Sequence, residues 1–408
     1  MKAISMMKQN LADVLFENQL KEKEDTPAVK LLRNLLHTGY QKGASDIHIE
    51  PQEEDVVIRM RVDGMLTEHM RIGKELHQPL ITCAKILAGM DIAEKRLPQD
   101  GHCKTRIQDI DLNLRAGSVP TIYGEKMVLR FLNMEAAIDR AEMFGMQEKN
   151  YQKLMEILKR PSGILYLTGP TGSGKTTTLY MILEWLKQKP VNIMTIEDPV
   201  EKQVEGINQV QINEQAGLTF EKGLRAILRQ DPDVIMVGET RDPLTARISV
   251  RAAITGHLVL STLHTRNAVG AIVRLLDMEV EPYLAAESLS GVVAQRLVRK
   301  ICPHCAKTME LSEQDANRLG LSKRIVRYGT GCEHCDRTGY QGRIAIHEVI
   351  LVDKTMRTMI TEKRPLEEIT AYVERNQKTG TLREELIQMV EEGITAVDEL
   401  ERLGYEEI

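Results

Sequence analysis

Residues 163–180, GILYLTGPTGSGKTTTLY, join a short apolar run to a glycine-rich turn that ends in a lysine and three threonines. The spacing matches GxxxxGK[ST], and it lies between a run typical of a buried strand and a run typical of a helix. Glycines let backbone N–H groups turn inward around phosphates, and the helix that follows presents the positive end of its dipole. A chance glycine turn is the alternative, but it would not bring the strand, the lysine and the hydroxyl together. The pattern therefore predicts a phosphate-binding loop.

Each residue type in such a loop has its own role. Lys175 is expected to reach the β- and γ-phosphates, and the Thr176 hydroxyl to ligate Mg²⁺. The loop by itself indicates only that a nucleoside triphosphate binds. The residues predicted to line this site are Gly169, Pro170, Thr171, Gly172, Ser173, Gly174, Lys175, Thr176 and Thr177.

Length and charge limit the classes of function. A chain of 408 residues is expected to hold two or three domains. Its 54 Lys and Arg residues are nearly balanced by 59 Asp and Glu residues, so no strong field favours nucleic acid. Residues 1–20 lack an apolar core with a cleavage site, and no stretch approaches 18 apolar residues. We expect a cytoplasmic protein without a transmembrane segment, at most peripheral to the inner face of a membrane.

The first third of the chain precedes the phosphate loop. Residues 1–38 are interpreted as a polar, helical lead-in, with a charge run KEKED and a helix that starts at Thr26 and Pro27 and docks by one apolar face. Residues 39–135 are predicted to form a small α/β (PAS-like) domain with mixed strands. Its strands lie in SDIHIEP, VVIRMRVDG and residues 111–132, with a hairpin turn at Asp63 and Gly64 and a helix over 75–90.

The remainder is predicted to be a RecA-like ATPase domain over residues 161–408, after a hinge at 136–160. Strand-like VNIMTIED, QVQIN, DVIMVG and HLVLSTL alternate with helical runs at 218–229, 243–254 and 267–276. Such alternation argues for a mainly parallel sheet with flanking helices. A segment at 300–345 interrupts the pattern, and residues 346–408 are interpreted as helical.

Acidic and histidine residues gather at the predicted strand ends, where an open α/β fold places its ligands. TIEDPVE carries Glu201, DPDVIMVGETRD carries Glu239, and HLVLSTLHT has His257 at its start and His264 near its end. Hydrolysis of a phosphoanhydride needs a metal clamp, a group that orients water and donors for the developing charge. Each residue alone reads as an exposed turn charge or a satisfied loop histidine. Together, downstream of a phosphate loop, they favour a hydrolytic site.

Four segments in order, GPTGSGKTTT, TIEDPVE, LRQDPDVIMVGETRD and TGHLVLSTLHT, resemble the Walker A, Asp box, Walker B and His box of the secretion ATPase superfamily. The resemblance runs from about residue 39 to the C-terminus. It is nearest to the assembly ATPases of type IV pili and type II secretion, with the related competence pseudopilus motors. The resemblance implies that Glu239 activates water, in a Walker B whose usual aspartate is Gly238. It also implies that Glu201 and His264 sense or polarise water and γ-phosphate, with His257 in support.

The same resemblance places arginine fingers in the preceding domain. Arg115 in DLNLRAGSVPT and Arg130 in VLRFL match those positions. A guanidinium there offsets transition-state charge when the domains close. Without the resemblance, both residues read as ordinary surface arginines of a strand.

The chain departs from the superfamily pattern at three places. Thr240 follows Glu239 where relatives usually carry an aliphatic residue, and Arg266 stands where they carry asparagine after His264 and Thr265. Neither change removes a reacting group. Many relatives also have an N-terminal docking domain, which about 25 polar residues would not form, so the sequence leaves the identity of the membrane platform open.

CPHC at 302–305 and CEHC at 332–335 are the second strong signal. Two CxxC turns can complete a tetrahedral site of four thiolates, the geometry of structural Zn²⁺. A redox dithiol is the alternative, and His304 and His334 could substitute as ligands although four cysteines already saturate the ion. Retraction ATPases generally lack this element, so it favours an assembly motor. The predicted zinc ligands are Cys302, Cys305, Cys332 and Cys335.

The motifs together with this resemblance imply a homo-hexameric, Mg²⁺-dependent ATPase that acts on an inner-membrane platform protein to assemble a pilus or pseudopilus. A retraction motor of the same superfamily is one alternative. A DNA-handling motor is another, in which Arg59 and Arg61 would track phosphates. A scaffold that binds ATP without hydrolysing it is the third.

Overall fold

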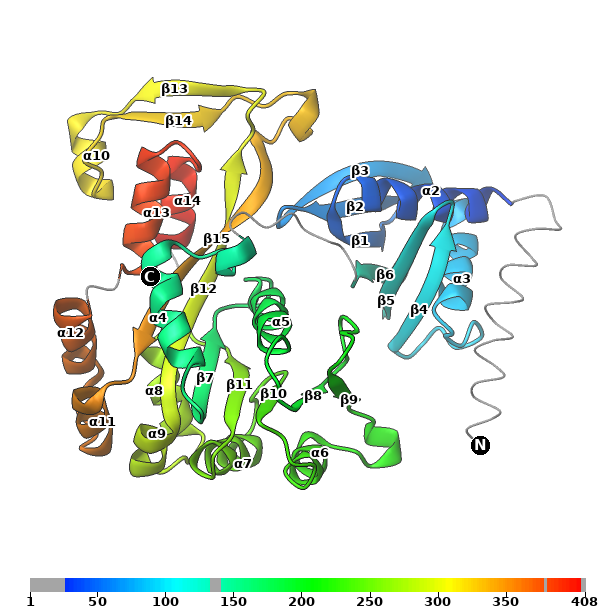
Figure 1. Ribbon diagram of the computed structural model, residues 1–408. Coiled ribbons are helices and arrows are strands. Elements are labelled where there is room, and N and C mark those ends of the chain that lie inside the picture. The colour runs from blue at the N-terminus through cyan, green and yellow to red at the C-terminus, as the bar shows by residue number, and fades with distance from the viewer. Residues whose placement is uncertain (1–25, 133–140, 378–379, 405–408) are drawn as a thin grey trace. The chain divides into compact units, whose positions relative to one another are not determined.

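The computed structural model describes residues 26–132, 141–377 and 380–404. The chain divides into two compact units, residues 1–136 and 137–408 (Figure 1). The KEKED run and most of the predicted lead-in lie outside the described residues, as does the start of the predicted hinge. No helix in the described ranges combines the length and apolarity that crossing a membrane requires.

Unit 1 is built on a six-stranded sheet in the order β3-β2-β1-β6-β5-β4. All its pairings are antiparallel, so the prediction of mixed strands was wrong. Antiparallel pairing follows from the short connections β1–β2, β2–β3, β4–β5 and β5–β6, since parallel strands need a long crossover. The strands are β1 (Ala44–Pro51), β2 (Asp55–Val62), β3 (Met65–Gly73), β4 (Gln99–Ile107), β5 (Ile110–Thr121) and β6 (Gly124–Phe131).

Two helices, α2 (Pro27–Gln41) and α3 (His77–Leu87), complete the core of unit 1. The Thr26 hydroxyl accepts from the backbone N–H of Val29 at the start of α2, and Leu32 and Leu35 are buried, so this helix docks by one face as predicted. The predicted hairpin turn is also confirmed, because Asp63 and Gly64 both have positive φ between β2 and β3.

Unit 2 contains a seven-stranded sheet in the order β15-β12-β7-β11-β10-β8-β9. Every pairing is parallel except that of β15 with β12. The four strands predicted after the phosphate loop are confirmed as β8, β9, β10 and β11. The strands are β7 (Gly163–Thr168), β8 (Ile193–Glu197), β9 (Asn208–Gln211), β10 (Val234–Val237), β11 (Leu258–Leu263), β12 (Leu289–Ile301) and β15 (Tyr340–Leu351).

Helices cover both faces of this sheet. Along β7, Ile164 and Tyr166 belong to one core cluster and Leu165 and Leu167 to the other. One face is covered by α4 (Glu148–Leu158) and α5 (Lys175–Leu186). The other is covered mainly by α6 (Phe220–Ile227), α7 (Pro243–Ile254), α8 (Gly270–Asp277) and α9 (Pro282–Ser288). Burial on both faces explains the continuous apolar run before the phosphate loop.

Strands β12 and β15 form a long antiparallel pair that leads to the cysteine segment (Figure 1). The prediction that residues 346–408 are helical was wrong for 346–351, which belong to β15. The segment between these strands holds β13 (Ala306–Glu310), α10 (Glu313–Leu319) and β14 (Ile325–Gly329). The C-terminal helices are α11 (Lys354–Thr361), α12 (Leu366–Asn376), α13 (Leu382–Glu391) and α14 (Val397–Gly404).

The helical part of the predicted hinge, α4, is packed within unit 2. Leu154 and Ile157 are fully buried against the sheet. Asn150 is also buried, and its Nδ2 atom donates to the backbone O of His347 in β15 at 2.7 Å. The backbone N–H of His347 in turn donates to Oε2 of Glu385 in α13 at 2.8 Å. These bonds join α4, β15 and α13.

Candidate functional site

The phosphate loop connects the C-terminal end of β7 to the start of α5. Gly169, Gly172 and Gly174 have φ values of 149°, 79° and 87°, which side chains rarely permit. A Cβ on Gly169 would lie 2.4 Å from the backbone O of Gln295, and one on Gly174 would lie 2.8 Å from Gln295 Nε2. Conformation and space therefore both require glycine at positions 169 and 174.

The start of α5 fits a phosphate group. The N-cap is Gly174, so no side chain caps the first N–H groups of the helix. The Oγ atom of Ser173 is buried and has no hydrogen-bond partner among the described residues. Nζ of Lys175 donates to the backbone O atoms of Gly169 and Pro170 at 2.7 and 3.0 Å. The loop thus gathers an ammonium group, a hydroxyl and backbone donors around one small space.

Glu239 and His264 lie at the C-terminal ends of the neighbouring parallel strands β10 and β11. The Oε2 atom of Glu239 is 4.0 Å from Nε2 of His264 and 2.5 Å from Nε of Arg241. The Glu239 side chain is 17% exposed, whereas that of Arg241 is 67% exposed. A half-buried carboxylate beside an imidazole, next to a phosphate loop, is suited to orienting and deprotonating water.

Burial and, after it, neighbouring charges lower two pKa values at this site. The pKa of Lys175 is lowered to about 8, first because burial disfavours the ammonium ion and then because the Arg296 guanidinium is near, while Glu239 acts in the opposite direction. The pKa of His264 is lowered by burial and then by the charge of Lys175, again against Glu239. The structure thus brings Lys175, Glu239 and His264 into one electrostatic group.

The structure accounts for the unusual Thr240. Its side chain is buried, and its hydroxyl is 2.9 Å from that of Ser261 on β11. The backbone N–H of Thr240 also donates to the backbone O of Thr262. A hydroxyl can replace an aliphatic group here because Ser261 supplies a partner.

The loop that carries Glu201 is held by a buried carboxylate. Glu197, at the end of β8, accepts hydrogen bonds from the hydroxyl of Tyr180 and from Nε2 of Gln209. The Tyr180 hydroxyl also accepts from the backbone N–H of Lys202, next to Glu201. Glu201 is exposed and interacts electrostatically with Tyr180, which belongs to α5. The sequence singled out Glu201 but missed Tyr180, because no motif spacing links residues so far apart.

His257 is not brought to this site within this chain, and its supporting role stays a prediction. It precedes β11, and its backbone O accepts from the N–H of Gly163 at the first residue of β7. The phosphate loop follows the other end of β7, and the two strands run parallel. The Nδ1 atom of His257 is 2.8 Å from the backbone O of Ala252. Within this chain His257 therefore joins α7 to β11 at the opposite edge of the sheet.

Arg115 and Arg130 are direct cross-strand partners on β5 and β6. Nε of Arg130 donates to Oδ1 of the buried Asp46 at 2.7 Å, and Nη2 of Arg115 is 3.6 Å from Oδ1 of Asp100. The two arginine side chains are 55% and 50% exposed. They form a pair of accessible guanidinium groups on the sheet of unit 1.

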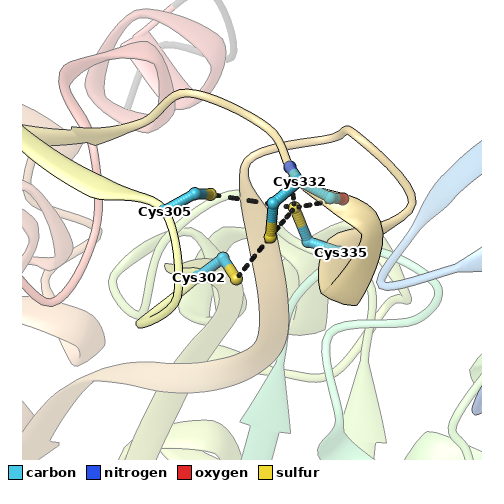
Figure 2. A group of neighbouring side chains, drawn as sticks. All are labelled: Cys302, Cys305, Cys332 and Cys335. Carbon is cyan, nitrogen blue, oxygen red and sulfur yellow. Dashed lines mark hydrogen bonds between the residues drawn. The ribbon is translucent and has the colours of Figure 1, made fainter.

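The four predicted metal ligands converge at the end of the β12–β15 pair. Cys302 directly follows β12, and Cys335 ends the short helix η4 (Glu333–Cys335). Figure 2 shows their side chains pointing toward one another from the two CxxC turns. The four Sγ atoms lie within 4.8 Å of one another, and the pairs 302–332, 305–335 and 332–335 are 3.9, 3.9 and 3.7 Å apart.

These distances fit a metal ion better than a redox pair. Tetrahedral Zn²⁺ with Zn–S bonds of about 2.3 Å separates its sulfur atoms by roughly 3.8 Å, whereas a disulfide needs about 2.05 Å. Burial alone would raise the pKa of Cys335, but hydrogen bonds from the N–H groups of Cys332 and Gly339 lower it to about 6. The rings of His304 and His334 stack on each other with centroids 4.1 Å apart. The cysteines alone supply the four donors.

The sequence comparisons place this arrangement in a known family. Residues 21–402 match the family described as "Type II/IV secretion system protein". The chain belongs to this family. It is 42% identical over 402 residues to the Type II secretion system ATPase E of Vibrio cholerae serotype O1, a match that covers 97% of this chain and 80% of that protein.

Two further matches agree with membership of the secretion family. The chain is 44% identical over 384 residues to the Type IV pilus assembly ATPase PilB of Thermus thermophilus, covering 93% of this chain and 43% of that protein. A crystal structure of the pilus retraction motor PilT with ADP has a TM-score of 0.61 and 24% identity, and covers 91% of this chain and 96% of that one. PilT shares the fold. The predicted resemblance to the secretion ATPases is confirmed, and an ATPase of this family uses ATP with Mg²⁺.

Proposed function

We propose that this protein hydrolyses ATP at the Lys175 site to power assembly of a type II secretion pseudopilus or a type IV pilus, including the competence type. One observation carries the proposal. Lys175, Glu239 and His264 come from three separate segments and meet at the C-terminal edge of one parallel sheet. Such an edge is where open α/β sheets bind ligands.

Each group has a distinct role in the proposed reaction. ATP with Mg²⁺ supplies the phosphoanhydride and the metal that offsets its charge. The loop from Gly169 to Thr177 binds the phosphates, and the hydroxyl of Thr176 is the proposed Mg²⁺ ligand. Glu239 accepts a proton from the attacking water, and His264 orients that water. Glu201 is proposed to act from the loop that Glu197 and Tyr180 hold.

The tetracysteine cluster supports an assembly motor. We propose that it binds one structural Zn²⁺ ion, which closes the tip of the β12–β15 pair. The identities of 42% and 44% are to proteins named for type II secretion and pilus assembly, whereas the match to the retraction motor PilT is at 24%. The retraction alternative is therefore supported by the shared fold alone.

We propose a homo-hexamer in which the PAS-like unit 1 presents Arg115 and Arg130 to a nucleotide, through its antiparallel sheet with helices on one face. The hexamer would act at the cytoplasmic side of the inner membrane on a platform protein. A reducing compartment suits the six cysteines, all of which lie in the described residues and none of which forms a disulfide there.

The structure offers no support for a DNA-handling motor. Arg59 pairs with Glu50, and Arg61 pairs with Asp46 at 3.7 Å, so the two arginines proposed to track phosphates already have acidic partners. Asp46 and Glu50 are both buried, and their charges lie on the same strand.

Turnover and binding assays with Lys175→Ala and Glu239→Gln test the proposed site. Lys175→Ala should abolish ATP binding and turnover, whereas Glu239→Gln should bind ATP without turnover. Normal ATP turnover by either variant would refute the proposed site. Zinc content and the ability to restore secretion or piliation in cells that lack their own assembly motor test the assembly role.

A further inference from the structure

Gln295, in the middle of β12, contacts the phosphate loop and the helix that follows it. Its Nε2 atom donates to the backbone O of Ser173 at 2.9 Å. Its Oε1 atom accepts from the hydroxyl of Thr178, in the first turn of α5, also at 2.9 Å. The residue is 2% exposed, so both bonds are shielded from water. One side chain thus bridges the loop and the helix that follows it.

The sheet register explains why Gln295 is in this position. Ala294 pairs with Thr168, the last residue of β7, so Gln295 lies beside Gly169. A Cβ on Gly169 would collide with the backbone of Gln295, and a Cβ on Gly174 would collide with its amide. Gln295 therefore leaves no room for a side chain at two glycine positions of the phosphate loop.

The surroundings of Gln295 strengthen its hydrogen bonds. Its cross-strand partner on β15 is His347, which is fully buried and whose ring nitrogens have no partner among the described residues. Burial lowers the pKa of His347 to about 3, so its ring is neutral at physiological pH. Hydrogen bonds that are shielded from water in this way are stronger than bonds that compete with water.

The consequence for the loop is geometric. An amide that holds the Ser173 carbonyl on the β12 side prevents that carbonyl from turning toward the phosphate space, where it would repel phosphate oxygens. The bond to Thr178 fixes the first turn of α5, whose N–H groups point at the same space. Both effects stabilise the arrangement that binds phosphate.

We propose that Gln295 is a positioning residue that holds the phosphate loop and the first turn of α5 in their nucleotide-binding conformation. This inference depends on the proposed function, since the loop it positions is the ATP site. Phosphate contacts exist both in the bound substrate and in the transition state. Loss of positioning should therefore raise the KM for ATP more than it lowers kcat.

The experiment compares full-length Gln295→Met with Gln377→Met as a matched control. Gln377 also bonds a backbone by both ends of its amide, with Leu351 at the far end of β15. Gln295→Met should raise the KM for ATP and the Kd for ADP by about tenfold, the order expected for two neutral hydrogen bonds. Its kcat and zinc content should change little, although its melting temperature should fall because Ser173 and Thr178 lose a buried partner. Gln377→Met should keep the wild-type KM.

Thr178→Val extends the test if Gln295→Met does not fold. It removes one of the two bonds and should raise KM by about threefold, and the double variant should be no worse than Gln295→Met alone. If Gln295→Met folds and keeps the wild-type KM for ATP and Kd for ADP, the positioning role is overturned. If Gln295→Met does not fold, the same result in Thr178→Val overturns it. If Lys175→Ala abolishes ATP binding in the same series, the proposed function survives that result. If Lys175→Ala binds ATP normally, the proposed function and the inference both fail.

Discussion

Oε2 of Glu239 lies 4.0 Å from Nε2 of His264, although 25 positions separate the two residues along the chain. They meet because β10 and β11 are adjacent and parallel, so both strands deliver their C-terminal residues to one edge. Lys175 follows the next strand across the sheet, β7. The parallel order of these three strands therefore assembles the proposed hydrolytic site.

Glu239→Gln should lower the kcat for ATP by at least about 100-fold, since a general base contributes about 10²–10⁴-fold. The amide keeps the shape of the side chain but cannot accept the proton of water. ATP affinity should stay near the wild-type value, as measured by equilibrium binding. Asp242→Asn is the control, because Asp242 caps α7 through the N–H groups of Leu244 and Thr245. Equal losses in the two variants would argue against a specific role for Glu239.

The pH dependence of ATP binding should follow the protonation state of Lys175. Its ammonium group loses its proton as pH rises through about 8, and only the charged form attracts phosphate. The kcat/KM for ATP should therefore be full below this pH and fall above it. At pH 9, ATP binding should take up a proton, which calorimetry in buffers of different ionisation enthalpy detects. A flat profile from pH 7 to 9.5 would contradict the lowered pKa.

The tetracysteine cluster should hold one zinc ion per chain. Cys302→Ser should lose this zinc and lower the melting temperature, because ion binding contributes to folding of the segment that it closes. Cys83→Ser and Cys103→Ser are matched controls, since neither residue belongs to the cluster. Elemental analysis of freshly purified protein gives the stoichiometry. Wild-type protein with no zinc would exclude the structural site.

Arg115→Ala and Arg130→Ala should each lower kcat strongly, by up to about 10³-fold if the residue acts as an arginine finger. The KM for ATP should change less, because the guanidinium acts on transition-state charge. Arg106→Ala provides a control on the same sheet, at a side chain that is 60% exposed. Steady-state kinetics of the three variants distinguish the roles. Full activity of both Arg115→Ala and Arg130→Ala would show that neither arginine takes part in ATP hydrolysis.

Thr240 and Ser261 should be energetically coupled. Thr240→Val leaves the buried hydroxyl of Ser261 without this partner, which costs about 1–3 kcal/mol. The double variant Thr240→Val/Ser261→Ala removes both hydroxyl groups and should recover part of that loss. Denaturant unfolding of both single variants and the double variant gives the coupling free energy. Purely additive effects would show that the 2.9 Å contact contributes little.

The sequence predicted the parts of the fold that follow local rules. The run before Gly169 reads as a strand because both faces of β7 are buried, and the turn at Asp63 and Gly64 has the residue types that positive φ favours. Strand β12 escaped prediction because Gln295, Arg296 and Arg299 interrupt its apolar pattern. The partners that allow polar residues to be buried there are remote. Gln295, for example, contacts Ser173, which lies 122 positions away.

The part of the candidate site that could be predicted consists of residues that follow parallel strands. Glu239 and His264 follow β10 and β11, so the predicted sheet brings them together. His257 shares a motif with His264 but stands at the other end of the same strand, so the shared motif did not indicate how far apart the two residues lie. The role of Tyr180 could not be predicted, because a tyrosine in an apolar helix has the pattern of a core residue. Only the structure shows that its hydroxyl donates to Glu197.

The bonds of Asn150 have a mechanical consequence. Asn150 ties α4 to the backbone of His347 in β15. His347 is the cross-strand partner of Gln295, which bonds the phosphate loop. A displacement of α4 would therefore act on the β12–β15 pair. The same strands would relay such a strain to the phosphate loop through Gln295.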